Sequence, residues 1–339
     1  MKTLLKVFFL LILTLSFVSC NISNDKLNKS TSKDENFISK NNDKKIEDNK
    51  ITQVPNTKEI IEFLCSDEIK SREAGTEGNK KTTKYLEKIF NELDLEYVFN
   101  NSYLNTFKYK SENEKIEEAS NVVGKISGNN SKKAIILTAH FDAWFNGALD
   151  NASGVASTIN IANSLKEYSK SNSLNYDIVF CLTNLEMNRF KGSEAFIKDI
   201  KDVYDEMFNI NIDCIGVNNN KPMAIKNLSK IDISQKLYDL LKETYDEYGV
   251  KHMDTFSTPK TRMAFERNQG VSDYISFEKA NIPNMQIAQI GIQDYILNEN
   301  DTPKNLDIDL INKISKSIIS LIKKDISKVY LIFSISKPL

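Results

Sequence analysis

The chain has 339 residues, of which 40% are hydrophobic, so it is long enough to bury the core of one large domain. Its 45 basic and 46 acidic residues leave a formal net charge of −1. Such an even balance argues against a nucleic-acid-binding surface and against strong attraction to an anionic membrane surface. We therefore expect no nucleic-acid partner.

The amino terminus has the pattern of a bacterial export signal. Lys2 and Lys6 form a basic start, and residues 4–17 form an apolar run that is short for a full membrane span. The run leads to Cys20 in Phe-Val-Ser-Cys, which resembles a lipobox. We expect residues 1–20 to be a lipoprotein signal peptide, and a lipid on Cys20 to hold the exported protein on the outer face of a membrane. Secretion, or anchoring by an uncleaved signal, is the alternative.

Two further segments lie outside the expected domain. Residues 21–57 are rich in Asn, Lys, Ser and Asp. A segment of this composition buries too little apolar surface to fold, so a flexible tether is predicted. The folded domain is expected at 58–327. The tail, 328–339, is unusually apolar for a chain end, and no function is assigned to it.

Between these segments, apolar periodicity predicts helices and strands in alternation. Helices are expected at 57–66, 77–93, 153–168, 192–199, 231–248 and 305–325. Strands are expected at 95–99, 118–125, 132–139, 176–182, 208–215 and 285–290. The alternation predicts an α/β fold, a three-layer α/β/α sandwich with a mostly parallel central sheet. Asp301 and Thr302 precede a proline, which suits a helix start, and are expected to cap a helix rather than to touch substrate.

The most informative stretch follows the expected strand 132–139. His140 and Asp142 come directly after this apolar run, where open α/β sheets place their ligands. Asp150 lies in a turn-rich loop that can return it over His140. Because the chain contains only two histidines, this arrangement indicates a metal site. Asp142 is placed to accept a proton from the other ring nitrogen of His140 and so to fix its tautomer.

Six motifs occur in the order in which a known family carries them. They occupy residues 72–79, 140–142, 150–154, 185–193, 211–216 and 272–283. The most characteristic are His-Phe-Asp at 140–142 and Asp-Asn-Ala-Ser-Gly at 150–154. Together they resemble the MH-clan zinc aminopeptidases and glutamate carboxypeptidases, and in particular bacterial leucyl aminopeptidases. The resemblance implies a zinc exopeptidase-like fold and a metallopeptidase-like domain at 58–327.

The resemblance also implies a role for single residues. In the family, one aspartate bridges two metal ions, and its position here is Asp150. One of the two ions also takes a histidine and a second aspartate, whose positions are His140 and Asp213. Glu186 falls at the position of the catalytic base. These four residues therefore match the family pattern.

The second metal site departs from that pattern. Where the family has a glutamate and a late histidine, this chain has Met187 and Leu297. A methionine offers zinc only a weak thioether and a leucine offers no ligand, so this half-site is expected to be degenerate. Asp294, Asn298 and Glu299 lie close to Leu297 in sequence and leave replacement ligands open.

The remaining residues support hydrolysis with one metal ion. His140, Asp150 and Asp213 make an acceptable three-ligand zinc shell with an open fourth position, in which a water molecule loses its proton more readily. Glu186 would take that proton. We therefore expect a metal-dependent, aminopeptidase-like exopeptidase that hydrolyses N-terminal peptide bonds with one zinc ion.

Two other functions stay open. A catalytically inactive pseudopeptidase would keep the fold to bind a peptide or a partner, and would need neither a bound ion nor Glu186. Glutaminyl cyclases share the fold, but they keep the late histidine that Leu297 replaces. Arginine occurs only at positions 72, 189, 262 and 267. So few arginines disfavour the clamps that bind acidic side chains in glutamate carboxypeptidases, although Arg262 and Arg267 are candidates for one carboxylate contact.

Overall fold

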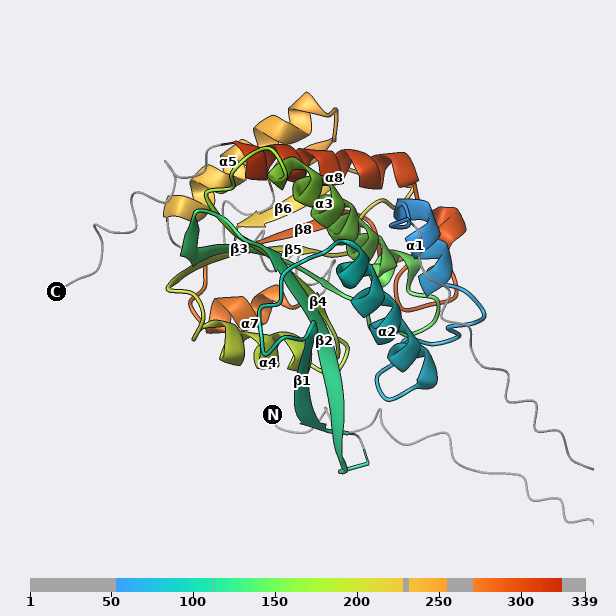
Figure 1. The fold of residues 1–339 in the computed structure, drawn as a ribbon. Coiled ribbons are helices and arrows are strands. Elements are labelled where there is room, and N and C mark those ends of the chain that lie inside the picture. Colours follow the sequence, from blue (N-terminus) through green and yellow to red (C-terminus); the bar gives the residue numbers. More distant parts are fainter. Residues whose placement is uncertain (1–52, 112, 228–231, 255–270, 325–339) are drawn as a thin grey trace, which may run out of the picture. The chain divides into compact units, whose positions relative to one another are not determined.

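The computed structural model describes residues 53–111, 113–227, 232–254 and 271–324, which belong to one compact unit, Lys50–Leu339 (Figure 1). The α-helices are α1 (Thr57–Leu64), α2 (Glu77–Glu92), α3 (Ser153–Ser169), α4 (Lys191–Ile200), α5 (Asp232–Glu247), α7 (Tyr274–Lys279) and α8 (Ile308–Lys323). The strands are β1 (Leu104–Lys110), β2 (Ile116–Ile126), β3 (Asn130–His140), β4 (Tyr176–Thr183), β5 (Glu206–Ile212), β6 (Met223–Asn227), β7 (His252–Asp254) and β8 (Asn284–Gln289). Two short helical turns are η1 (Ala148–Ala152) and η2 (Pro303–Asn305).

The described strands form one sheet in the order β1-β2-β4-β3-β5-β8-β6-β7. The four central strands, β4, β3, β5 and β8, run parallel to one another. On either side of them the sheet is mixed, because β2 pairs antiparallel with β4 and β6 pairs antiparallel with β8. Every residue of β4 and β8 is buried, as expected for central strands covered on both faces.

Helices cover both faces of the sheet (Figure 1). On one face α3 packs against α1 and α8, and α8 also packs against α5, whereas α4 and α7 pack together on the other. Alternate residues of the central strands enter different cores: Leu137 and Phe180 join the larger apolar cluster, and Ile136 and Val179 join the smaller one. The predicted three-layer α/β/α architecture is confirmed.

The predicted elements differ from the structure mainly at the edges of the sheet. The expected strand at 95–99 is wrong, because Glu96 makes only an isolated bridge with Lys125. The outer antiparallel partner of β2 is instead β1, which was not predicted and which pairs from Leu104 to Lys110. Nor were β6, β7 and α7 predicted. The last helix starts at Ile308 rather than at 305, because η2 precedes it.

Several predicted features lie outside the described residues. These are the signal peptide with Cys20, most of the tether, the tail at 328–339, and Arg262 with Arg267. Residues 53–57, which the prediction placed in the tether, lead into α1. Asn56 caps this helix through its side-chain oxygen, which accepts from the backbone N–H groups of Lys58 and Glu59. Within the described ranges, no helix is long and apolar enough to cross a membrane.

Candidate metal centre

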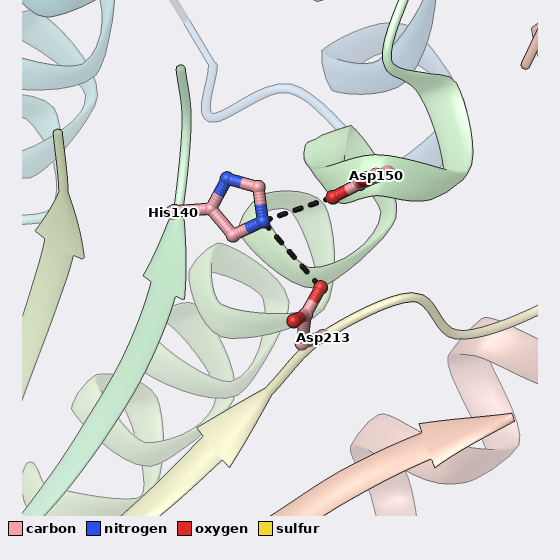
Figure 2. A group of neighbouring side chains, drawn as sticks. All are labelled: His140, Asp150 and Asp213. Atoms are coloured by element: carbon pink, nitrogen blue, oxygen red, sulfur yellow. Dashed lines mark ion pairs between the residues drawn. The ribbon is translucent and has the colours of Figure 1, made fainter. Parts of the chain in front are cut away.

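The topology of the sheet brings the candidate site residues together. His140 is the last residue of β3, Asp213 directly follows β5, and Glu186 lies three residues beyond the end of β4. β3 pairs in parallel with both β4 and β5, so these three carboxyl ends meet at one edge of the sheet. Asp150 reaches the same edge from η1, the turn that leads into α3 (Figure 2).

His140, Asp150 and Asp213 form a compact group that fits a metal ion (Figure 2). His140 Nε2 lies 3.0 Å from Asp150 Oδ1 and 3.5 Å from Asp213 Oδ1. Two ligand atoms of a tetrahedral zinc ion are separated by about 3.4 Å, given bond lengths near 2.1 Å. Asp213 Oδ1 is buried and has no hydrogen-bond partner among the described residues. A buried carboxylate oxygen without a donor, facing an imidazole, is what a cation at this point would satisfy.

The charged side chains of this group shift one another's pKa values. Burial lowers the pKa of His140, but the charge of Glu186 and the contacts with Asp142, Asp150 and Asp213 outweigh burial and raise that pKa well above its usual value. For Asp213, burial acts to raise the pKa, yet the contact with His140 and its charge bring it below its usual value. The carboxylates around His140 therefore favour its protonated form, and a cation that binds Nε2 would compete with that proton.

Asp142 acts differently from the prediction. His140 Nδ1 lies 3.0 Å from the backbone oxygen of Asp142, whereas the nearer carboxylate oxygen is 3.7 Å away. The tautomer of His140 is thus fixed by a backbone carbonyl. The Asp142 carboxylate instead accepts hydrogen bonds from the backbone N–H groups of Glu186 and Met187, both at 3.1 Å. Asp142 therefore fastens the turn that carries the candidate base to the loop that follows His140.

Glu186 is buried at this edge of the sheet, with an exposed fraction of 7%. Burial raises its pKa well above the usual value, and the charge of His140 opposes that effect without cancelling it. The nearby carboxylates of Asp273, Asp213 and Asp150 raise the pKa further. A buried carboxyl group whose pKa is raised above its usual value is suited to take up a proton.

In the part of the chain that the structure describes, the positions near the expected second site bring no further carboxylate into a ligand group. Met187 is half-buried, and Leu297 is 46% exposed in a turn. Asp294 and Glu299 are exposed, and the Asn298 side chain bonds to nearby backbone. Among the described residues, His140, Asp150 and Asp213 make up the one group of His, Cys, Asp or Glu that could hold a metal ion.

Asp301 has a role that was not predicted from the sequence, because it binds the backbone next to a candidate metal ligand. The predicted helix start is present, because Thr302 is the N-cap residue of η2 and Pro303 opens it, but no side chain caps this turn. The cap of α8 is Asp307, which accepts from the backbone N–H of Leu310 at 3.0 Å. Asp301 is buried, and its two carboxylate oxygens accept the backbone N–H groups of Leu149 at 2.5 Å and of Asp150 at 3.2 Å. It therefore holds the backbone of a candidate metal ligand.

Asn151 links two of the ligand loops. Its side-chain oxygen accepts from the backbone N–H groups of Gly154 at 2.9 Å and Cys214 at 3.2 Å, and its side-chain nitrogen donates to the Ile212 oxygen at 2.9 Å. A Cβ at Gly154 would lie 2.4 Å from both the Asn151 side chain and the Ile212 oxygen. Only glycine allows this approach, so the loop of Asp150 is tied to the loop of Asp213.

Solved structures with similar folds include aminopeptidases and cyclases. The LapA aminopeptidase of Legionella pneumophila is 20% identical, with a TM-score of 0.62 over 79% of this chain and 70% of that one. BSAP, a zinc aminopeptidase from Bacillus subtilis, is 13% identical, with a TM-score of 0.60 over 80% and 95% of the two chains. The glutaminyl cyclase of Porphyromonas gingivalis is 14% identical, with a TM-score of 0.63 over 80% and 98%. These likenesses show the zinc exopeptidase-type fold.

A family profile identifies the chain more directly. No curated protein matches the sequence. The profile of Peptidase family M28, however, matches residues 121–322, which is more than half of the chain and includes every residue of the candidate metal group. The match agrees with the resemblance that the motifs carry, and the chain belongs to peptidase family M28.

Proposed function

We propose that the protein is a metal-dependent, aminopeptidase-like exopeptidase that works with one zinc ion. The observation that carries the proposal is the group of His140, Asp150 and Asp213, in which Asp150 Oδ1 and Asp213 Oδ1 both lie within ion-pair distance of His140 Nε2 and the buried Asp213 Oδ1 accepts no hydrogen bond from the described residues. Membership of peptidase family M28 supports hydrolysis, and BSAP, on the same fold, is described as a zinc aminopeptidase.

Each side chain then has a definite task in peptide hydrolysis. A bound zinc ion supplies Lewis acidity to the scissile carbonyl and to the attacking water. Glu186 takes a proton from that water and returns it to the amine that leaves when the peptide bond breaks. Asp142 holds Glu186 in place through its backbone N–H. His140, Asp150 and Asp213 hold the ion.

A single ion is proposed because the residues at the other half-site are not metal ligands. Met187 brings neither a charge nor a hard oxygen, and Leu297, which stands at the sequence position of the family's late histidine, has no ligand atom. Neither Asp294 nor Glu299 joins the ligand group. Removing two ligands from a site leaves no basis for holding a second zinc ion firmly.

A catalytically inactive binding protein is the second candidate function. The observation that favours it is the replacement of a carboxylate by Met187, directly beside the candidate base. In that case the carboxyl edge of the sheet would bind a peptide or a partner without turning it over, and replacing Glu186 would leave binding unchanged.

Hydrolysis of a panel of aminoacyl amides and short peptides, run on the zinc-loaded chain, tests the proposal. Glu186→Gln should lower kcat by roughly 10²–10⁴-fold, because it removes the general base. The zinc content should stay the same, because Glu186 is not a ligand. His252→Gln is the matched control, since His252 pairs with Asp246 outside the metal group.

The other outcomes separate the alternatives. A zinc-loaded wild-type chain without turnover on the whole panel, and with the same peptide affinity as Glu186→Gln, would show the inactive binder. Conversion of a peptide with an N-terminal glutamine into its pyroglutamyl form, without hydrolysis of the others, would show the cyclase reaction.

A further inference from the structure

Arg72 is a buried charge that the proposed mechanism does not use. It lies between α1 and α2 with an exposed fraction of 1%. Its guanidinium donates four hydrogen bonds, all to backbone oxygens: to Phe141, Leu64 and Gly147 at 2.7 Å and to Asn146 at 2.8 Å. No carboxylate in the described ranges forms an ion pair with it. A buried arginine that binds only carbonyl groups serves to fix the course of a chain.

Three of these four carbonyls belong to the segment that joins two site residues. Residues 141–149 run from His140 to Asp150, and Arg72 binds this segment at Phe141 and again at Asn146 and Gly147. Gly147 adopts a φ of +57°, and a Cβ there would lie 2.6 Å from Arg72 Nη2. The segment therefore closes directly over the guanidinium.

Asp301 binds the far end of the same segment with the opposite charge. Its carboxylate takes the N–H groups of Leu149 and Asp150, while Arg72 takes carbonyl groups only. Burial raises the pKa of the Asp301 carboxyl to about 6, while the hydrogen bonds from Leu149 and Asp150 and the charge of Arg72 act to lower it. The segment is thus held at two points. The buried guanidinium of Arg72 donates to its carbonyl oxygens, and the buried carboxylate of Asp301 accepts from backbone N–H groups at its end.

We propose that Arg72 and Asp301 are positioning residues that set the affinity for the metal ion by fixing segment 141–149, on which the spacing of His140 and Asp150 depends. This inference rests on the proposed function only in that a metal must bind the group. The physical reason is pre-organisation: a ligand carried on a loop binds less tightly when the loop must first be ordered. Neither residue belongs to the metal group itself.

Conservative substitutions can break each contact with little change in volume. Arg72→Lys keeps the charge but replaces a planar fork of five donors by a single ammonium, which cannot reach carbonyls on three sides. Asp301→Asn turns one acceptor oxygen into an N–H donor, which then faces a backbone N–H. Arg189→Lys and Asp177→Asn are matched controls, because Arg189 is exposed and Asp177 is a buried carboxylate that binds Lys125 and Tyr204.

The test measures zinc affinity of the full chain by competition with a chromophoric chelator, together with the absorption spectrum of the cobalt-substituted protein. We expect Arg72→Lys and Asp301→Asn each to weaken zinc binding at least tenfold and to change the cobalt spectrum, while near-ultraviolet circular dichroism shows the metal-free variants folded. Both controls should bind within twofold of the wild type.

Two results would overturn the inference. One is a folded Arg72→Lys or Asp301→Asn variant with unchanged zinc affinity and an unchanged cobalt spectrum; if one variant fails to fold, the other decides. The second is an equal loss in the matched controls, which would mean that the metal site responds to any change in the domain. A wild-type chain that binds no zinc would instead contradict the proposed function itself.

Discussion

At the scale of single residues, the two ring nitrogens of His140 have different partners in the candidate site. Nε2 of His140 faces Asp150 and Asp213, and Nδ1 faces the backbone oxygen of Asp142. Because that carbonyl accepts a hydrogen, Nδ1 carries the proton and Nε2 is left free for a metal ion. The Asp142 carboxylate is then available to hold Glu186.

Zinc affinity should rise with pH. In the metal-free chain the surrounding carboxylates raise the pKa of His140, so below that pKa a cation must displace a proton. Affinity should rise about tenfold per pH unit across this range and level off above it. Calorimetric titration in buffers of different ionisation enthalpy should find about one proton released per ion. An unchanged slope in His252→Gln is the control, and no proton release would contradict the account.

Replacing Asp142 separates two roles that a carboxylate in this place can have. Asp142→Asn loses one of the acceptors that hold Glu186 and Met187, so kcat should fall roughly 10- to 100-fold. The zinc affinity should change little, because the backbone oxygen still orients His140. Steady-state kinetics and chelator competition on the same sample decide. A loss of zinc affinity as large as the loss of kcat would show that the carboxylate orients the histidine after all.

At the scale of elements, the strands deliver the ligands and the loops between them fix their spacing. β3 and β5 end at the ligands His140 and Asp213, and the side chain of Asn151 ties the loop of Asp150 to the backbone next to Asp213. The tightest point in this connection is Gly154, whose Cα leaves no space for a side chain.

Gly154→Ala should therefore destabilise the domain by about 2 to 3 kcal/mol, because the added Cβ overlaps the Ile212 oxygen. Gly249→Ala is the comparison, since nothing lies within 4 Å of a Cβ there and only its φ of +66° resists a side chain. That substitution should cost about 1 kcal/mol. Urea unfolding of the metal-free chain measures both, and equal costs would mean that the close approach at Gly154 is relieved without penalty.

The sequence predicted the elements well where apolar periodicity is strong. It predicted them less well at the lateral edges of the sheet, where that periodicity is weaker. The helices α1 to α5 and α8 and the central strands follow from continuous apolar runs or helical periods. β1 was missed although its burial alternates, because an edge strand of this kind carries few apolar residues. Leu95 resembled the start of a strand, but it belongs to the larger apolar cluster, and its backbone N–H bonds to the oxygen of Phe90 in α2.

For the site, the sequence located the side chains that carry chemistry and missed those that act on backbone. His140, Asp150 and Asp213 stand in motifs, and the structure brings them together. Three of the four hydrogen bonds of Arg72, and both of those of Asp301, go to backbone groups of residues 141–150, far from either residue in sequence. Backbone groups have no signature in the sequence, so no pattern connects position 72 or position 301 with that loop.

At the scale of the whole molecule, we propose an exported enzyme held at the membrane by a lipid on Cys20. Expression in a bacterial host with labelled palmitate should label the wild-type chain and leave Cys20→Ser unlabelled. Cys65→Ser, a change within the folded domain, is the control and should be labelled normally. Labelling that persists in Cys20→Ser would rule out this anchor.

The central claim is that one zinc ion binds His140, Asp150 and Asp213 and that the second half-site is lost. Zinc K-edge X-ray absorption with elemental analysis of the wild-type chain and of His140→Ala tests it most directly. The account predicts about one zinc ion per chain, one imidazole and carboxylate oxygens at about 2.0–2.2 Å, no zinc neighbour near 3.5 Å, and loss of the ion in His140→Ala. Two ions per chain with a zinc–zinc distance of about 3.5 Å, or no zinc at all, would contradict it.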